Sequence, residues 1–300
     1  MDRLEAMSLI VAATEAGSLS AAARRLGVPL ATMSRKVSDL ESHLRTRLLV
    51  RSTRRLALTD AGRSYVEACR RILDEVAEAE RAASGEYRAP RGELAITAPV
   101  VFGRLHLLPI VVDFLKAHAQ IAVRLSLVDR VVHLLEERID AAVRIGELPD
   151  SSLVATRVGA TRQVVCASPA YLAARGTPQR PADLAVHDCL TFEGIASASA
   201  WSFALRGKMQ SVALRSRLVV NTAEAAIDAA IAGLGITRVL SYQVENAVRS
   251  GSLALVLTAY EPAPSPVSLV HAGGRLLPLK LRAFLDFAAP RLRARLAASP

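Results

Sequence analysis

Two neighbouring segments near the N-terminus decide the fold of the first domain: GSLSAAARRLG at residues 17–27 and LATMSRKVSDLESHL at residues 30–44. In the first segment, Ser18 is a favourable helix N-cap, and Gly27 suits a left-handed helix end. In the second segment, apolar residues recur at spacings of three and four, which gives a helix one apolar side. These residues are Leu30, Met33, Val37, Leu40 and Leu44. A short helix, a tight turn and a second helix predict a helix-turn-helix.

The other side of the second helix is polar and basic, with Thr32, Arg35 and Lys36 facing outward. In a helix-turn-helix this helix enters the major groove of DNA, and Ser34 can cap, contact phosphate, or both. The simpler interpretation is a solvated helix surface. Its position between the first helix and an arginine-rich segment favours DNA binding.

An arginine-rich segment, LLVRSTRRLALT at residues 48–59, follows the second helix. Alternating apolar and polar residues around its turn predict a two-stranded wing, and arginine is suited to phosphates or a narrow minor groove. The DNA-binding candidates are Ser18, Ser20, Leu30, Ala31, Thr32, Ser34, Arg35, Lys36, Arg51, Thr53, Arg54 and Arg55.

The charge of the 300-residue chain agrees with a nucleic-acid partner. Lys and Arg number 38 against 28 Asp and Glu, giving a net charge of +10, and residues 1–64 are the most densely positive part. A hydrophobic content of 51% excludes a disordered chain. No uninterrupted apolar run of membrane-spanning length and no secretion signal are visible, so we expect a cytoplasmic protein without a membrane partner.

Residues 59–86 contain no proline and predict one long helix. Its apolar positions repeat at spacings of four and three, which is a heptad seam that favours pairing with a second copy. The seam residues are Tyr65, Cys69, Ile72, Val76, Ala79 and Ala83. A helix packed on its own domain is the alternative. The segment RAPRG at residues 88–92 then breaks the helix and is the best linker candidate.

Beyond the linker, strands alternate with helices. The pattern predicts a strand at 94–98, a helix at 99–118 kinked at Pro109, a strand at 122–128, a helix at 130–138 and a strand at 140–144. This order is typical of a mainly parallel sheet covered by helices on both faces. A second series begins near residue 162, with strands near 164–167, 190–192, 201–205, 212–220 and 236 and helices from 168 and at 222–232. The last strand, 267–271, and the last helix, 279–296, are assigned to the first lobe, so that two α/β lobes share a cleft.

Several residues at strand ends are candidates for binding a small molecule. Thr97, Ala98, Pro99 and Val100 lie where a strand gives way to a helix, and free N–H groups there suit a carboxylate. Asn221 and Thr222 repeat the arrangement in the second lobe, and a plain helix cap is the alternative at both places. Arg144, followed by Gly146, could bind an effector carboxylate or pair with Asp129 or Asp140. Phe192, Trp201 and Gly235 are weaker candidates.

The sequence does not favour an enzyme. It lacks GxSxG, HExxH, Walker A and complete GxGxxG motifs, so we expect neither catalysis nor a cofactor or metal. Cys69, Cys166 and Cys189 lack zinc-site spacing and are interpreted as structural thiols, with a redox pair of Cys166 and Cys189 as the alternative. A binding protein of the same two-lobed shape without gene regulation is the alternative function.

Taken in order, these segments resemble the LysR-type transcriptional regulators along essentially the whole chain. The resemblance rests on GSLSAAARRLG, SRKVSDLE (34–41), LLVRSTRRLALTDAG (48–62), RGELAITAP (91–99), DAAVRIG (140–146) and ASPAYLA (167–173). It implies a winged helix-turn-helix at 1–60, a dimerising linker helix and hinge at 61–90, and at 91–300 an effector-binding domain similar to periplasmic binding proteins. Lobe I would comprise residues 91–161 and 266–300, and lobe II residues 162–265.

The resemblance also implies a homo-oligomer, a dimer through the linker helix assembled into a tetramer, which binds double-stranded DNA. A small molecule between the lobes would change how the DNA-binding heads are set. The sequence departs from the family where Pro29 and Leu30 replace a polar cap and glutamine, so base reading there must rely on apolar contact with thymine methyls and on Thr32 and Arg35. Arg45 replaces a glycine common before the wing.

Overall fold

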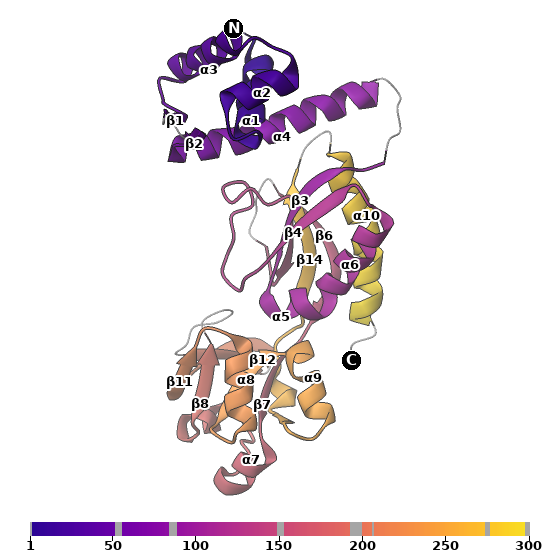
Figure 1. The fold of residues 1–300 in the computed structure, drawn as a ribbon. Coiled ribbons are helices and arrows are strands. Elements are labelled where there is room, and N and C mark those ends of the chain that lie inside the picture. Colours follow the sequence, from indigo (N-terminus) through magenta and orange to yellow (C-terminus); the bar gives the residue numbers. More distant parts are fainter. Residues whose placement is uncertain are drawn as a thin grey trace. The chain divides into compact units, whose positions relative to one another are not determined.

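The computed structural model describes residues 2–51, 56–83, 89–148, 153–192, 200–205, 207–273 and 277–297. The chain divides into two compact units, Met1–Arg88 and Ala89–Pro300. We call them the head and the body, and Figure 1 colours them along the sequence from indigo to yellow.

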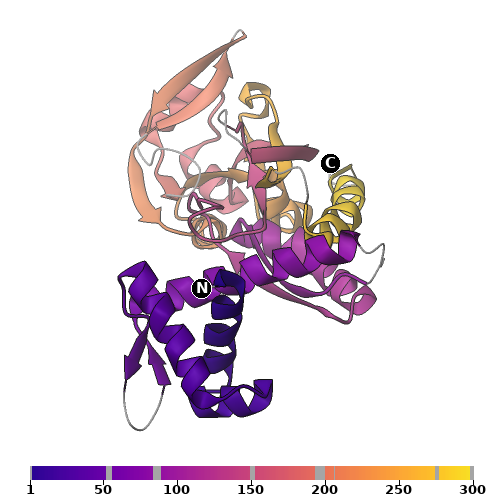
Figure 2. The same cartoon turned by 90° about the horizontal axis from the view of Figure 1, so that it is seen from above.

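The head contains helices and a two-stranded wing. Its elements are α1 (Arg3–Glu15), α2 (Leu19–Leu26), α3 (Leu30–Leu44), β1 (Leu49–Arg51), β2 (Leu56–Leu58) and α4 (Asp60–Ala83). The side chain of Ser18 accepts a hydrogen bond from the N–H of Ala21, and Gly27 ends α2 with φ of 67°. The helix-turn-helix predicted from the two segments is therefore present, with α3 at its predicted bounds. In Figure 2 the two short arrows of the wing lie at the edge of the indigo head.

Helix α4 packs on its own domain over its first turns. Val66 and Cys69 are buried with Ala6 and Ile10 of α1, and Tyr65 packs against the same cluster. Ile72, the next residue of the predicted seam, is 38% exposed. The first two seam residues therefore serve the core of the head, and the seam that remains for a second copy begins at Ile72.

Lobe I of the body is built on a five-stranded sheet in the order β4-β3-β5-β14-β6. The strands are β3 (Gly92–Ala98), β4 (Ile121–Leu127), β5 (Ala141–Ile145), β6 (Leu153–Thr161) and β14 (Ser265–Ala272). Helices α6 (Leu108–Ala117) and α10 (Leu279–Ala297) pack on it around buried Phe114 and Phe284. Short α5 (Val100–Phe102) runs through a π-helical turn, Gly103–Leu107, into α6.

Lobe II is built on a second five-stranded sheet, β11-β8-β12-β7-β13. Its strands are β7 (Gln163–Ala167), β8 (Cys189–Phe192), β11 (Ser216–Val220), β12 (Ile236–Leu240) and β13 (Ala254–Val256). Its helices are α7 (Pro169–Arg175), α8 (Ala223–Ile231) and α9 (Ser241–Arg249), with 3-10 turns at Pro181–Val186 and Thr258–Tyr260. Strands β9 (Ala200–Leu205) and β10 (Lys208–Ala213) pair as a separate antiparallel ribbon, the long orange arrows of Figure 2.

Each of the two sheets is mainly parallel and contains one antiparallel strand. In lobe I, β3 runs parallel to β4 and β5, whereas β14 is antiparallel to both β5 and β6. In lobe II, β8 runs parallel to β11 and β12, whereas β7 is antiparallel to β12 and β13. Four of the five strands in each sheet therefore run in one direction, as predicted, and one strand is reversed: β14 in lobe I and β7 in lobe II. Each reversed strand is the one at which the chain arrives from the other lobe. The strand predicted over 212–220, in contrast, is two strands, β10 and β11, in different sheets.

The helix predicted at 130–138 is also wrong. The segment makes compact turns, because the carboxylate of Glu137 pairs with Arg130 and accepts the N–H of His133. Val132 and Leu134 are buried while Val131 is exposed, an alternation that does not match helical periodicity. The kink predicted at Pro109 is instead the π-helical turn before it, and Pro109 lies in the first turn of α6, where its missing N–H is tolerated.

Candidate functional site

Helix α3 buries one side and leaves the other open. Met33, Val37 and Leu40 are buried, whereas Arg35 and Ala31 are exposed. Leu30, at the first position of the helix, is 49% exposed, so it is available for a contact with thymine methyls. Thr32 and Ser34 are half-buried beside them.

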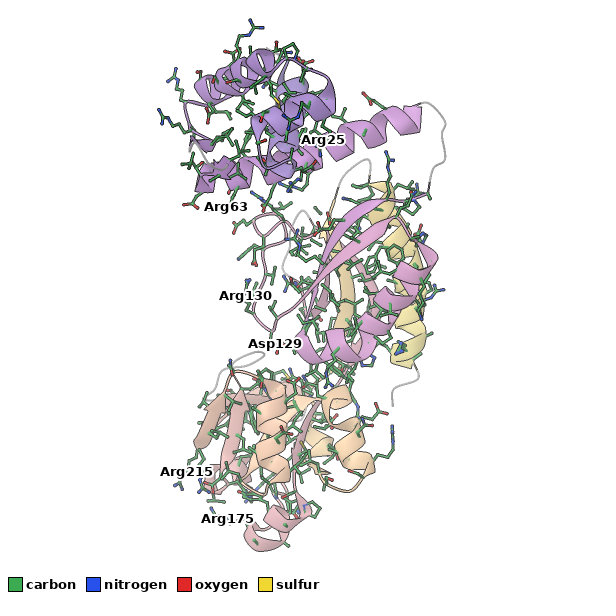
Figure 3. All side chains as sticks on the ribbon, in the orientation of Figure 1. Arg25, Arg63, Asp129, Arg130, Arg175 and Arg215 are labelled. Atoms are coloured by element: carbon green, nitrogen blue, oxygen red, sulfur yellow. The ribbon has the colours of Figure 1, made fainter. Side chains whose placement is uncertain are left out.

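Lys36 differs from its neighbours on α3. Its ammonium pairs with the carboxylate of Glu5 on α1, and its side chain is only 27% exposed. A second ion pair within the head joins Arg25 of α2 to Glu15 of α1, with 2.9 Å between Nη2 and Oε2. Figure 3 labels Arg25 and, at the start of α4, Arg63, which pairs with Asp60. Lys36 therefore fastens α3 to α1, which leaves Arg35 as the more available cation of the two.

The serines of the predicted site have local roles. Ser18 caps α2 through the N–H of Ala21 at 3.0 Å, and its hydroxyl lies 3.4 Å from that of Ser20. A hydroxyl oxygen that already accepts one N–H can still donate its own proton to a phosphate. Ser18 and Ser20 thus sit together at the start of α2.

The wing is held to α3 by a residue that the sequence interpretation missed. Glu41 accepts hydrogen bonds from the N–H groups of Leu48 and Leu49 at 2.7 and 2.9 Å. Strands β1 and β2 then pair antiparallel, with Arg51 opposite Leu56. The wing candidates Thr53, Arg54 and Arg55 lie outside the described residues. No periodicity rule singles out Glu41, because its partner is a backbone seven residues away.

Arg45 forms the end of α3 in a left-handed conformation, with φ of 50°. Its N–H bonds the carbonyl of Ser42 at 3.2 Å, and the N–H of Thr46 bonds that of Glu41 at 3.1 Å. Glycine adopts this conformation without the steric cost that a side chain adds. Arg45 adopts this conformation despite the steric strain, and its side chain places an exposed cation between α3 and the wing.

In lobe I, the predicted anion site at the start of α5 holds a carboxylate of the chain itself. The N–H of Val100 donates to Asp129 Oδ1 at 3.0 Å. Asp129 follows β4, and Figure 3 shows it beside α5. The hydroxyl of buried Thr97 donates to the carbonyl of Ser126 at 2.8 Å, and Ala98 is buried, so both belong to the interior of lobe I. Pro99 and Val100 are half-buried.

In lobe II, the predicted site at the start of α8 is capped by its own residue. Thr222 accepts the N–H of Ala225 at 3.3 Å, and Asn221 is exposed. Glu224 lies in the first turn of α8 and has a buried oxygen, Oε2, without a hydrogen-bond partner among the described residues. Sequence analysis did not select Glu224.

The two lobes meet through an aromatic cluster. Tyr242 of α9 packs edge-on against Phe102 and His106, with ring centroids 5.6 and 5.3 Å apart. Burial, helped by the charges of Asp129 and Glu224, raises the pKa of Tyr242 above its ordinary range. Burial also raises the pKa of Asp129, against the bond from Val100 and with help from Glu224. Burial lowers the pKa of His106, which favours its neutral imidazole.

The remaining predicted effector residues make contacts within their own lobes. Arg144 donates to the carbonyl of Val132, and burial lowers its pKa. The two carboxylates predicted as possible partners of Arg144 bond backbone groups instead: Asp140 accepts the N–H of Ala95 at 2.8 Å, and Asp129 accepts that of Val100. Gly146 has φ of 110°, a conformation that favours glycine.

Phe192, Trp201 and Gly235 lie within lobe II. The two aromatic residues are buried in its cores. A Cβ at Gly235 would collide with the carbonyl oxygen of Asp188, so glycine permits the close approach of the chain there. The guanidinium of Arg238 lies 5.4 Å from the ring centroid of Trp201.

Both units match family profiles. Residues 4–63 match the bacterial regulatory helix-turn-helix protein, lysR family, and residues 88–293 match the LysR substrate binding domain. The chain belongs to the LysR family of transcriptional regulators. Like the rest of that family, this LysR-type regulator combines a helix-turn-helix DNA-binding domain with an effector-binding domain.

Individual relatives cover nearly the whole chain. The HTH-type transcriptional activator AaeR of Escherichia coli is 33% identical over 286 residues, 95% of this chain and 93% of that protein. An HTH-type transcriptional repressor of Pseudomonas aeruginosa is 34% identical over 289 residues, 96% of this chain and 91% of that protein. The structure of CrgA, a LysR-type transcriptional regulator from Neisseria meningitidis, aligns with a TM-score of 0.61 and 31% identity, covering 96% of this chain and 98% of that one.

Two further properties concern metals and membranes. Among the described residues, no group of three or more His, Cys, Asp or Glu side chains is placed to hold a metal ion. No single described helix has the length and hydropathy to cross a bilayer. Only α1 and α2 taken together are long and apolar enough among the described helices, and the two are bent by 118° relative to each other.

Proposed function

We propose that this LysR-type regulator binds operator DNA through the outer face of α3 and the wing, and that a small molecule bound between lobes I and II alters this binding. The observation that carries the DNA-binding part is the division of α3 into a buried apolar side and an exposed side bearing Arg35 and Leu30. Thr32 and Ser34 would complete the contacts to the major groove.

Ser18, Ser20, Lys36 and the wing residues Arg51, Thr53, Arg54 and Arg55 would contact the phosphate backbone. One head contacts few phosphates, so a specific site requires at least two heads. Ile72 of α4 is exposed, and the seam from Ile72 onward would supply the pairing surface for a dimer; two dimers would form a tetramer. We further propose a cytoplasmic regulator without catalytic activity, cofactor or metal.

In the effector part, the two helix starts, Pro99–Val100 of lobe I and Asn221–Thr222 of lobe II, would line the ligand site, with N–H groups at both starts already bonded to Asp129 and Thr222. An effector must bind one arrangement of the lobes better than another, because equal affinity shifts no equilibrium. The proposed boundaries are a DNA-binding domain at 1–60, a linker helix at 61–90, and the effector-binding domain at 91–300.

Genome-wide mapping of bound DNA tests the proposal. We expect a small set of bound sites, each with two half-sites related by two-fold symmetry. The logarithm of the association constant for such a site should fall by about 0.9 for each neutralised phosphate when the salt concentration rises tenfold. Binding that is flat in salt, or spread evenly over the genome, would contradict the proposal. The matched control is a full-length variant with Arg35→Ala, which should lose the site pattern.

A further inference from the structure

Two carboxylates from different lobes belong to segments that adjoin α9: Asp129 accepts the N–H of Val100, the first residue of α5, Glu224 lies on α8, and both α5 and α8 contact α9. Asp129 follows β4 of lobe I, and Glu224 belongs to α8 of lobe II. Burial is the main cause of the raised pKa of Tyr242 and of Asp129; the charges of Asp129 and Glu224 raise the pKa of Tyr242 further, and the charge of Glu224 adds to the shift of Asp129. We call Asp129, Glu224, Tyr242, Phe102 and His106 the joint cluster.

Three polar atoms of the joint cluster are buried without a hydrogen-bond partner among the described residues. They are the hydroxyl of Tyr242, Oε2 of Glu224 and Nε2 of His106. Tyr242 is only 6% exposed. Buried polar atoms in folded proteins nearly always have partners, and leaving one without a partner costs folding free energy. The three atoms therefore point to a polar group that is supplied from outside the chain.

The chemistry of the three atoms defines that group. A carboxylate oxygen only accepts hydrogen bonds, a neutral imidazole nitrogen can accept one, and a phenol oxygen can do so as well. The electrostatic environment of the two carboxylates is negative. Arg295 and Glu245 act on His106 with opposite signs. An anion would be repelled, and the N–H of Val100 that could have held it already donates to Asp129.

We propose that the effector presents a protonated amino group to the joint cluster, attached to an apolar body. This inference rests on the proposed function, in which a small molecule binds between the lobes, and it replaces the carboxylate expected from the sequence. An ammonium has donors for Glu224 Oε2 and the oxygen of Tyr242, and its charge balances the two carboxylates. The ring of Tyr242 suits a cation next to it, and the fully buried Phe102 supports that ring from within the core.

The positions of these residues fit a ligand that links the lobes. Asp129, Val100 and Glu224 are half-buried and so remain accessible from solvent, whereas Tyr242 and His106 are buried behind them. His106 belongs to the π-helical turn between α5 and α6, and such turns occur often at functional sites. A cation that contacts Asp129 and Glu224 together would relieve the repulsion between the lobes and favour one lobe arrangement.

Calorimetric titration of the full-length protein at pH 7 tests the proposal with three probes of the same size and different charge: benzylamine, benzyl alcohol and benzoate. Butylamine and cyclohexylamine extend the ammonium set to other bodies. We expect saturable binding of at least one amine. The affinity for benzyl alcohol should be at least about tenfold lower than the affinity for that amine, and benzoate should not bind.

Near-isosteric variants locate the site. Asp129→Asn and Glu224→Gln remove one charge each but keep an acceptor oxygen, and Tyr242→Phe keeps the ring contacts. We expect the two charge variants to weaken amine binding about tenfold or more, and Tyr242→Phe to weaken it less. Asp228→Asn, one turn further along α8 and exposed, is the matched control and should bind the amine as the wild type does.

The inference is wrong if benzoate binds as well as any amine, if none of the three amines binds, or if Asp228→Asn loses affinity as much as Glu224→Gln. Operator binding by the same preparation, measured without any probe, reports on the proposed function separately. Operator binding with preferred binding of benzoate would leave the regulator assignment intact and refute the amine alone. Amine binding without operator binding would support the amine site and contradict the proposed DNA-binding function.

Discussion

The outer face of α3 and the joint cluster differ in how the chain assembles them and in the sign of their charge. The outer face of α3 comes from consecutive residues and bears the exposed cation Arg35. The joint cluster draws Asp129, Glu224 and Tyr242 from three elements far apart in sequence, and its charge is negative. Local periodicity suffices to find the first surface, whereas only the folded chain assembles the second. The opposite charges also separate the partners, a polyanion for the head and a cation for the body.

Breaking the inner side of α3 should have the largest effect. Leu40 is fully buried in the cluster with Ile10 and Leu48. Leu40→Ala should lower the free energy of unfolding of the head by about 2–5 kcal/mol, since the substitution leaves a cavity. Denaturant unfolding followed by circular dichroism measures this. Exposed Asp39→Ala is the control and should change it by about 0.5 kcal/mol or less. Equal effects would mean that α3 does not pack as described.

Breaking the outer side should affect DNA and not the fold. Arg35→Ala should weaken operator binding by about 1–3 kcal/mol and reduce the preference for the operator over unrelated DNA, if Arg35 reads a guanine edge. Fluorescence anisotropy with both DNAs measures the two affinities. Lys36→Ala is the comparison, because Lys36 pairs with Glu5 and should show a smaller, sequence-independent loss. An unchanged preference in Arg35→Ala would reduce Arg35 to a phosphate contact.

At the joint cluster, removing the helix cap should have a smaller effect. Asp129→Ala takes away the acceptor for the N–H of Val100 and should cost about 1 kcal/mol of stability, whereas Asp129→Asn keeps an acceptor. Thermal unfolding of the body measures both. If the alanine variant is as stable as the asparagine variant, the bond to Val100 does not contribute.

The pH dependence of the same pair follows from the raised pKa of Asp129. Burial disfavours the charged carboxylate, so its contribution to stability is largest below the ordinary value of 3.8 and is lost as pH rises through the folded value. Asn cannot ionise. The stability of Asp129→Asn relative to wild type should therefore increase as pH rises from 3.8 towards neutrality. A difference that falls over this range would contradict the direction of the shift.

The smallest expected effect concerns the cysteines, which neither surface uses. Burial raises the pKa of Cys166 and of Cys189 to about 12, and all three thiols are buried and free. Iodoacetamide at pH 8 should therefore modify the native protein very little, while the unfolded chain takes up three equivalents by mass spectrometry. Rapid modification of Cys166 or Cys189 in the native protein would revive the redox alternative.

The sequence by itself determined the head. The N-cap at Ser18, the left-handed Gly27 and the apolar stripe of α3 are local signals, because helix bonds join residues four apart. It also determined that α/β lobes follow a linker. It could not give the direction of strands that cross between lobes, nor the turns at 130–138, where the burial of Val132 and Leu134 does not follow helical spacing.

Only the tertiary structure decided what occupies the helix starts of the two lobes. Pro99–Val100 and Asn221–Thr222 are similar in sequence, yet one is capped by Asp129 from another strand and the other by its own threonine. Electrostatic and hydrogen-bond partners are chosen by distance in space, which the order of residues does not encode locally. The charge of a site assembled in this way, and hence the charge of its ligand, emerges only when the chain is folded.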